Sequence, residues 1–179
     1  IFSLPFAPIC LEESWLTPYD IDVKSKYSIN FQYFLISNQF WIHKSHKTAF
    51  EALKILTDQK GMQDIHIICT GKTEDSRFPH FIEDLTKTIE NLKLKDKIHI
   101  LGHIPKREQI EIMKESLGVL QPTLFEGGPG GGAVHDAISL GVPSIVSDIP
   151  VNKEIKAENV YFFKTKDAED LSKKMHNLI

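Results

Sequence analysis

A glutamate followed by a run of glycines is the part of the sequence most suited to chemistry. Glu126 stands directly before five closely spaced glycines, namely Gly127, Gly128, Gly130, Gly131 and Gly132. Glycine lacks a Cβ atom, so the backbone can adopt positive φ and its N–H groups can approach a bulky anion closely. A helix that begins after such a loop adds unsatisfied amides and the positive end of its dipole, which favour phosphate. The stretch predicts a site for a diphosphate-bearing ligand beside an acid.

The residues on either side of this loop predict the elements that position it. An apolar run ends at Gln121-Pro122, residues 133–140 have the pattern of an amphipathic helix, and residues 143–146 form a second apolar run. This order of strand, loop, helix and strand is a βαβ unit. Glycine runs also form flexible linkers, which is the alternative interpretation. The position at a strand-to-helix turn, where α/β proteins bind ligands, favours the binding site.

The same alternation extends over most of the chain. Short apolar runs predict strands at residues 31–37, 65–70, 98–101, 118–121, 143–146 and 159–163. Helical spacing of apolar residues predicts helices near residues 47–59, 81–92, 110–117, 133–140 and 171–178. Such alternation predicts an α/β fold with a Rossmann-like, doubly wound parallel sheet. Ligands bind beyond the carboxyl ends of the strands in these sheets. We therefore expect four loops to form the site, those that start at Asn38, Gly71, Gly102 and Phe125.

The chain divides into an N-terminal connector and one domain. Residues 1–30 are rich in proline and acid and show no sustained periodicity, which predicts an extended interdomain connector. Residues 31–179 contain all the predicted strands and make up the Rossmann-like domain. The first residue is Ile1 rather than Met, which indicates a piece of a longer protein.

Composition excludes several classes of function. The 179 residues are 41% hydrophobic and 25% charged, which is ordinary for a globular domain. A net charge of -3 with mixed signs predicts neither a nucleic-acid-binding stripe nor a polybasic membrane patch. No apolar run reaches transmembrane length and no signal peptide is visible. Cys10 and Cys69 lie far apart and are predicted to be reduced thiols of a cytoplasmic protein.

Several sequence motifs, taken together with the spacing between them, resemble the motifs of one group of enzymes. The motifs are Lys44 after the first predicted strand, CTG at 69–71, LGHIP at 101–105, FEGG at 125–128 and LGVPSIVSDIPVNKEI at 140–155. Together they resemble the C-terminal half of retaining GT-B glycosyltransferases, above all the glycosyltransferase group 1 family, which uses nucleotide-sugar donors. The resemblance covers residues 31–155.

The resemblance assigns roles to residues of this chain. It implies that Glu126 meets the donor sugar, that the loop amides meet sugar and phosphate, and that Lys44 stabilises the leaving diphosphate. Asp136 matches the second acid, which holds the ribose, although the family usually has glutamate there and a loop two residues shorter. A buried carboxylate matched to sugar hydroxyls discriminates strongly between ligands.

Further donor contacts follow from the same resemblance. Gly71 and Lys72 are expected near the phosphates or ribose, and His103 and Ile104 against the base. Where the family has an arginine, this chain has Gln39, which can donate a hydrogen bond but carries no charge. Lys47 is a residue that could compensate.

The resemblance also implies an activity for the parent protein. It implies hexosyl transfer with retention, from a UDP- or GDP-linked sugar, without a metal or other cofactor. The acceptor site belongs to an N-terminal domain that this chain lacks, so the isolated fragment is expected to bind donor and remain inactive. Polysaccharide biosynthesis is a common role of relatives, and peripheral membrane association of the full-length enzyme would fit that role.

Two alternatives remain at this stage. Residues 128–133 satisfy G-x-G-x-x-A, and Asp148 follows about twenty residues on, as in the NAD-binding domains of oxidoreductases. Such fingerprints normally open the first βα unit, whereas this one follows the fourth predicted strand. The other alternative is a module that binds a nucleotide sugar without catalysing transfer.

Two histidine arrangements have weaker interpretations. His43 and His46 are three residues apart and could share a metal, but no third ligand is evident. His135 lies beside Asp136, yet adjacent helical residues point in different directions, which argues against a catalytic dyad.

Overall fold

The structure is a computed structural model that describes residues 12–59 and 62–179. Its core is a six-stranded parallel sheet in the order β3-β2-β1-β4-β5-β6. The strands are β1 (Gln32–Ser37), β2 (Ile65–Thr70), β3 (Ile98–Gly102), β4 (Val119–Gln121), β5 (Ser144–Ser147) and β6 (Val160–Phe163). The order reverses between β1 and β4, as in doubly wound sheets. The predicted fold class is confirmed, and each predicted strand is present with its ends within one residue.

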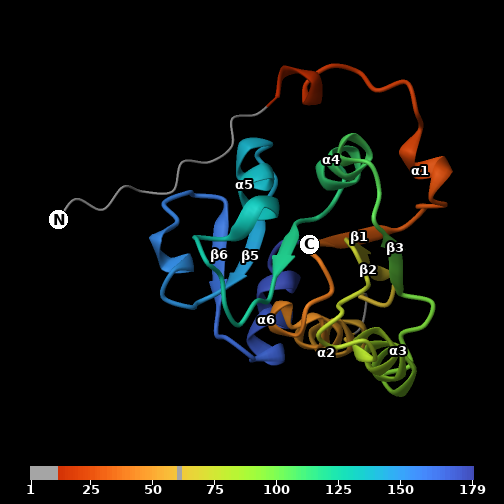
Figure 1. The fold of residues 1–179 in the computed structure, drawn as a ribbon, viewed down its shortest axis with the longest axis vertical. Helices are drawn as coiled ribbons and strands as arrows, with labels where there is room; N and C mark the ends of the chain where they lie inside the picture. The colour runs from red at the N-terminus through yellow and green to blue at the C-terminus, as the bar shows by residue number, and fades with distance from the viewer. Residues whose placement is uncertain (1–11, 60–61) are drawn as a thin grey trace.

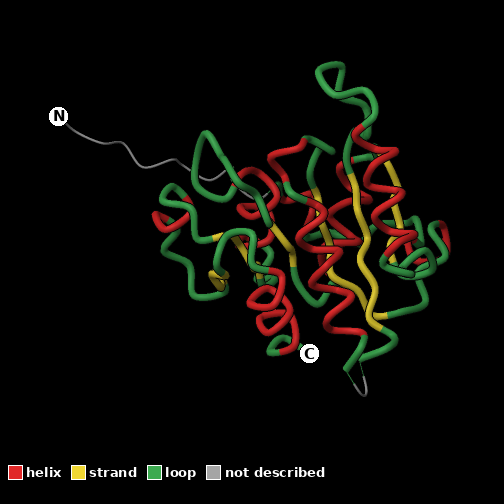
Figure 2. The backbone as a smooth tube through the Cα atoms, turned by 90° about the horizontal axis from the view of Figure 1, so that it is seen from below, coloured by secondary structure: helices red, strands yellow, loops and turns green. Residues whose placement is uncertain are grey.

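Helices cover both faces of the sheet (Figures 1 and 2). On one face lie α2 (His46–Thr57), α3 (Phe81–Asn91) and α6 (Ala168–His176). On the other lie α1 (Val23–Lys26), α4 (Lys106–Lys114) and α5 (Gly131–Ser139). Strand residues alternate between these two cores because successive side chains point to opposite faces: Phe34 and Ile36 contact the first, Tyr33 and Leu35 the second.

The helices differ more from their predicted bounds than the strands do, and two of the differences lie beside the site. The helix predicted at residues 110–117 begins at Lys106 and ends at Lys114, so Leu117 lies beyond it. Helix α5 begins at Gly131, two residues earlier than predicted, although glycine is a poor helix former. Tertiary contacts of the glycine loop override that propensity.

The segment before the sheet is not extended throughout. Between residues 12 and 30 it contains the short helix η1 (Glu13–Trp15) as well as α1, and Trp15, Val23 and Ile29 are buried. Residues 1–11, which include Cys10, lie outside the described residues. The role of this segment as an interdomain connector stays a prediction.

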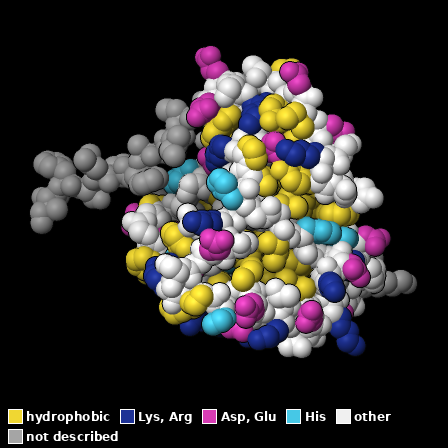
Figure 3. Space-filling view, turned by 45° about the vertical axis from the view of Figure 1, so that its right-hand side comes forward, with side chains coloured by type: hydrophobic (Ala, Val, Ile, Leu, Met, Phe, Trp, Pro, Cys, Tyr) yellow, Lys and Arg dark blue, Asp and Glu magenta, His cyan; other side chains and the backbone are white. Residues whose placement is uncertain are grey.

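The surface carries charges of both signs. Figure 3 shows basic and acidic side chains interspersed with apolar ones on the face that it displays. Within the described residues, no helix is both long and apolar enough to span a membrane. Cys69 is buried in the core, and this burial raises the pKa of its thiol.

His46 is a buried histidine with an unusual environment. It is the first residue of α2, is 0% exposed, and its ring stacks on Phe40 with centroids 4.3 Å apart. Neither ring nitrogen has a hydrogen-bond partner. Burial, aided by the positive charge of Lys44, lowers the pKa of His46 to about 3. The metal interpretation of His43 and His46 gains no support, since no three potential ligands gather anywhere in the described parts of the chain.

The buried imidazole makes stability depend on pH. Its folded-state pKa of about 3 lies below the ordinary value of 6.5, so the unfolded chain binds more protons between these limits. Stability is therefore full above pH 6.5 and falls as the pH is lowered. We expect the wild-type protein to lose about 2 kcal/mol more than His46→Phe between pH 7 and pH 5. Urea denaturation at both pH values measures this, with exposed His80→Ala as the control; parallel losses in wild type and His46→Phe would contradict the prediction.

Candidate functional site

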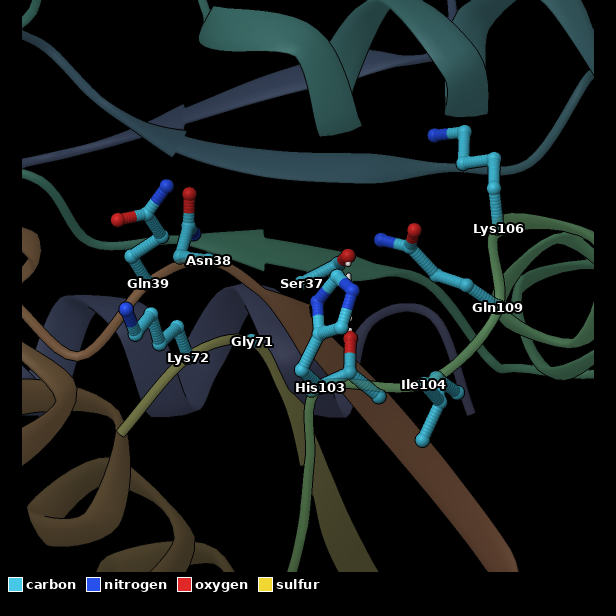
Figure 4. Close-up of a pocket in the computed structure, with 10 residues that line it drawn as sticks. Ser37, Asn38, Gln39, Gly71, Lys72, His103, Ile104, Lys106 and Gln109 are labelled. Atoms are coloured by element: carbon cyan, nitrogen blue, oxygen red, sulfur yellow. Dashed lines mark hydrogen bonds between the residues drawn. The ribbon is translucent and has the colours of Figure 1, made fainter. Parts of the chain in front are cut away.

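A pocket opens at the carboxyl ends of β1, β2 and β3. Its volume is about 250 Å³. Five of its lining residues are ones that the sequence singled out: Gln39, Gly71, Lys72, His103 and Ile104. Figure 4 shows Asn38, Gln39 and Lys72 on one side and Lys106 and Gln109 on the other, with His103 between them. The structure thus brings together residues from three separate loops, as the predicted topology requires.

Backbone hydrogen bonds hold these loops against one another. Asn38 N donates to Thr70 O at 3.0 Å, and Gly71 N donates to Gly102 O at 2.8 Å. At the base of the pocket, the Thr70 hydroxyl donates to Ser37 Oγ at 3.2 Å (Figure 4). The strand ends therefore continue their parallel pairing into the loops, which fixes the shape of the pocket.

Asn38 was expected only as the start of a site loop, and four other lining residues were missed by the sequence reasoning: Ser37, Thr70, Lys106 and Gln109. Ser37 and Thr70 are the last residues of β1 and β2, so the predicted strand ends could have identified them. Lys106 and Gln109 lie in the first turn of α4. Their orientation depends on how α4 rotates against the sheet, and the sequence carries no signal for that.

Lys44 and Glu126 form an ion pair beside the pocket. Lys44 Nζ lies 2.5 Å from Glu126 Oε1, and both side chains are about 10% exposed. Gln121 Nε2 donates to the same carboxylate oxygen at 2.7 Å, and Asn38 Nδ2 donates to Gln121 Oε1 at 2.5 Å. A continuous chain of hydrogen bonds therefore links the pocket wall at Asn38 to the Lys44–Glu126 pair.

The loops that carry this pair are tied together directly. Lys44 ends the short helix η2 (Ile42–Lys44) after β1, and Glu126 follows β4, the neighbouring strand. Leu124 N donates to His43 O at 2.7 Å, and the Thr123 hydroxyl donates to the same carbonyl at 3.2 Å. Two residues 82 positions apart are thereby fixed as neighbours. The sequence predicted both residues for the site but not their pairing.

The glycine loop is held by a buried asparagine. Asn152 is 0% exposed; its Oδ1 accepts from Gly130 N at 2.9 Å and its Nδ2 donates to Ser147 O at 2.9 Å. Gly130 has φ +69°, and an added Cβ there would lie 2.9 Å from Val134 side-chain atoms. This network argues against the flexible-linker interpretation of the loop.

Two glycines of the loop use the positive φ that the residue type permits. Gly130 and Gly131 adopt it, with φ +69° and +67°, whereas Gly127, Gly128 and Gly132 do not. An added Cβ at Gly127 or Gly132 would meet nothing within 4 Å, so both stand beside open space.

Asp136 lies in a second pocket that adjoins the first. The pocket has a volume of about 240 Å³ and shares Ser37, Lys106 and Gln109 with the first. The Asp136 carboxylate is buried and accepts a hydrogen bond from Lys106 Nζ, an ion pair that the sequence did not indicate. His135 instead contacts Pro129 O, at 2.9 Å from its Nε2. The argument against a His135–Asp136 dyad agrees with this geometry.

The lysines that line these pockets do not include Lys47, which was considered as a substitute for the missing arginine. Lys72 lines the first pocket and Lys106 lines both. Lys47 lines neither; it is exposed on α2, with its Nζ 3.8 Å from Glu51 Oε1. Positive charge in the pocket that Gln39 lines therefore comes from Lys72, in the loop after β2, and from Lys106, the first residue of α4.

Comparison with known proteins identifies the family. Residues 21–179 match the family model described as Glycosyl transferases group 1. The chain belongs to this family. It is 25% identical over 146 residues to the O-antigen chain mannosyltransferase RfbU of Salmonella typhimurium, covering 82% of this chain and 38% of that protein. The chain thus spans well under half of that group 1 relative.

Two solved structures share the fold of this group 1 chain. The C-terminal domain of the group 1 protein LpcC from Francisella tularensis has a TM-score of 0.74 at 17% identity, covering 94% of this chain and 87% of that one. HepE from Anabaena, solved in complex with UDP-glucose, has a TM-score of 0.77 at 13% identity, covering 94% and 45%. The fold is therefore that of GT-B glycosyltransferase domains.

The NAD-binding alternative does not fit a group 1 glycosyltransferase. Its proposed ribose ligand, Asp148, is engaged within the fold: its Oδ1 accepts from Thr165 N at 3.0 Å and from the Thr165 hydroxyl at 2.8 Å. These hydrogen bonds hold the pKa of Asp148 below its ordinary value. Asp148 therefore anchors the loop after β6.

Proposed function

We propose that this chain binds the nucleotide-sugar donor of a retaining glycosyltransferase and forms the donor half of that enzyme. One observation carries the proposal: the five residues expected around phosphate and base line a single pocket, joined by hydrogen bonds through Asn38 and Gln121 to the Lys44–Glu126 pair. The loop amides and the amino end of α5 lie on the same edge of the sheet. This edge is where doubly wound sheets bind nucleotides.

Each charged group has a task in the proposed transfer. The glycosidic bond to the diphosphate breaks with its electron pair leaving on phosphate oxygen. Lys72 and Lys44 stabilise that growing negative charge, and Glu126 accepts hydrogen bonds from sugar hydroxyls and orients the ring. The acceptor hydroxyl bonds to the anomeric carbon from the same face and releases its proton to a diphosphate oxygen. Configuration is thereby retained.

The Lys44–Glu126 pair sets the electrostatics of this step. In the free protein the two charges neutralise each other at 2.5 Å. A diphosphate that enters the pocket competes with Glu126 for Lys44, which releases a carboxylate oxygen toward the sugar. Binding of the leaving group is thereby coupled to orientation of the sugar.

The relatives support the class of donor and acceptor. HepE was solved with UDP-glucose, and RfbU is a mannosyltransferase of the O-antigen chain. We infer a UDP- or GDP-linked hexose as donor and a growing polysaccharide as acceptor, with no metal required. Since the match covers 38% of RfbU, we propose that the acceptor is held by another part of the parent enzyme and that residues 1–179 alone bind donor without transfer. We place the parent enzyme in the cytoplasm, in peripheral contact with the membrane.

Calorimetric titration with UDP, GDP, ADP and NAD tests donor binding. We expect the chain to bind one nucleoside diphosphate and to ignore NAD. Replacing Lys72 with alanine removes a pocket cation and should raise Kd about tenfold, whereas Lys87→Ala, an exposed residue of α3, should not change it. Binding of NAD that disappears in Asp148→Ala would replace the proposal with the oxidoreductase alternative. Failure of all four ligands to bind would contradict donor binding by this chain.

A further inference from the structure

One wall of the second pocket comes from outside the sheet. Beside Asp136, Lys106 and residues of α5, the pocket is lined by Glu12 and Trp15. Both precede residue 21, where the match to the family model begins. Trp15 is 5% exposed, although it lies in a segment with little regular structure. Its burial therefore depends on how that segment is attached to the domain.

Two cations of α4 attach the leading segment, which we define as residues 12–19. Arg107 donates from Nη1 to Ser14 O, and from Nη2 to Thr17 O at 2.5 Å. Lys114 Nζ donates to Trp15 O, between those two carbonyls. Hydrogen bonds from charged donors are stronger than those between neutral groups. Three carbonyls within residues 14–17 are thus held by one helix.

The Arg107 guanidinium is held by two further contacts, with Glu111 and with Tyr19. Its Nη2 lies 2.8 Å from Glu111 Oε1, and its Cζ lies over the Tyr19 ring at 5.1 Å from the centroid. The side chain is 17% exposed. Arg107 therefore connects both ends of the leading segment to α4, whose first turn lines the donor pocket.

Trp15 reaches the pocket residues through Lys106. Lys106 Nζ lies over the indole at 5.2 Å from its centroid and also pairs with Asp136. A cation above an aromatic face is stabilised by the ring quadrupole. The indole thus restricts the lysine that neutralises Asp136, the residue expected at the ribose. It also provides the one large apolar surface of a pocket whose other lining side chains are small, polar or charged.

We propose that Trp15 is part of the donor site and forms the wall against which the nucleoside of the donor packs. This inference rests on the proposed function. The two adjoining pockets, which share three residues, together approach the size of small-ligand sites. The leading segment completes a site that the family-matched domain begins, and it positions Lys106 for the nucleoside end of the diphosphate.

The fluorescence of Trp15 can be used to detect nucleotide binding at this wall. The chain has two tryptophans, Trp15 and Trp41, so Trp41→Phe leaves Trp15 as the only one. We expect UDP or GDP, whichever binds by calorimetry, to change Trp15 emission in this variant with the Kd measured calorimetrically on the same protein. Emission that stays constant at saturating nucleotide would overturn the proposal.

Matched variants test the contribution to affinity. Trp15→Ala should raise Kd about tenfold, and Trp15→Phe, which keeps an aromatic wall, should recover most of the loss. Leu16→Ala is the control, since Leu16 is the next residue and is 68% exposed. Wild-type binding with equal Kd in Trp15→Ala and Leu16→Ala would overturn this inference alone. A wild type that binds no nucleotide would overturn the proposed function instead.

Discussion

Replacing Glu126 with glutamine in the full-length protein is expected to slow sugar transfer roughly a hundredfold to a thousandfold. In the proposed function the carboxylate orients the sugar and balances Lys44, and glutamine keeps its shape without its charge. Lys44→Met removes the cation proposed to stabilise the leaving diphosphate and should cause a loss of similar size. Initial rates of nucleoside diphosphate release, from the donor identified by calorimetry, measure both.

The ion pair also contributes to stability, and this contribution must be separated from catalysis. Each single change leaves the other charge nearly buried, since both side chains are about 10% exposed, and should cost about 3 kcal/mol of unfolding free energy. The double variant Lys44→Met/Glu126→Gln removes both charges and should recover most of that stability. It should not recover transfer, because the charges act on the reacting groups.

The contrast between the variants decides the role of the pair. A double variant that regained both stability and transfer would show that Lys44 and Glu126 only support the fold. Lys54 and Asp58 provide the matched control, because they form an exposed pair at the carboxyl end of α2 with Nζ to Oδ1 of 2.5 Å. Removing both of those charges should change stability by less than about 1 kcal/mol and leave transfer intact.

The sequence contained enough information to predict the sheet and the edge where the site lies. Buried parallel strands are short apolar runs, and turn residues bound them, so their positions could be read directly. Once the strands were placed, the parallel topology required the loops at Asn38, Gly71 and Gly102 to meet. The pocket confirms that expectation. Roles for single residues within it came from the family resemblance and stay predictions.

Contacts between distant side chains could not be predicted in the same way. Gln121 and Asn152 were not singled out, because an amide in an apolar run or a polar loop has no distinctive pattern. Their importance comes from partners 5 and 22 residues away, at Glu126 and Gly130. Lys106 was missed for a related reason: its partner Asp136 lies on another helix, and packing alone brings α4 and α5 together. Such pairings depend on helix rotation and loop path, which periodicity does not determine.

Glycines illustrate the same limit. Residue type shows that the glycines of this loop can adopt positive φ, but it does not show which of them do, and in the structure these are Gly130 and Gly131. By contrast, Gly71 received only a ligand-contact role from the resemblance. The structure adds a steric one, because the loops after β1 and β2 approach each other there too closely for any side chain.

Substitution of Gly71 by alanine should therefore be among the most damaging single changes in the chain. Gly71 has φ +137°, and an added Cβ would lie 2.0 Å from Asn38 O and 2.5 Å from Asn38 C. These are backbone atoms of a residue whose N–H donates to Thr70 O, so they cannot move far without disturbing that hydrogen bond. We expect a loss of about 4 kcal/mol of unfolding free energy, measured by urea denaturation.

Alanine substitutions at two other glycines distinguish the two causes of that loss, steric overlap of the added Cβ and the positive φ. Gly102→Ala keeps a positive φ of +69° but meets nothing within 4 Å, so it should cost only about 1 kcal/mol. Gly127→Ala has neither constraint and should change stability by less than about 0.5 kcal/mol. If Gly71→Ala proved no worse than Gly102→Ala, backbone conformation alone would explain its effect and the close approach of Asn38 would be relaxed in solution. The expected ranking would instead show that Asn38 stays close to the Gly71 backbone in solution, the position from which it makes the hydrogen bonds through Gln121 to Glu126.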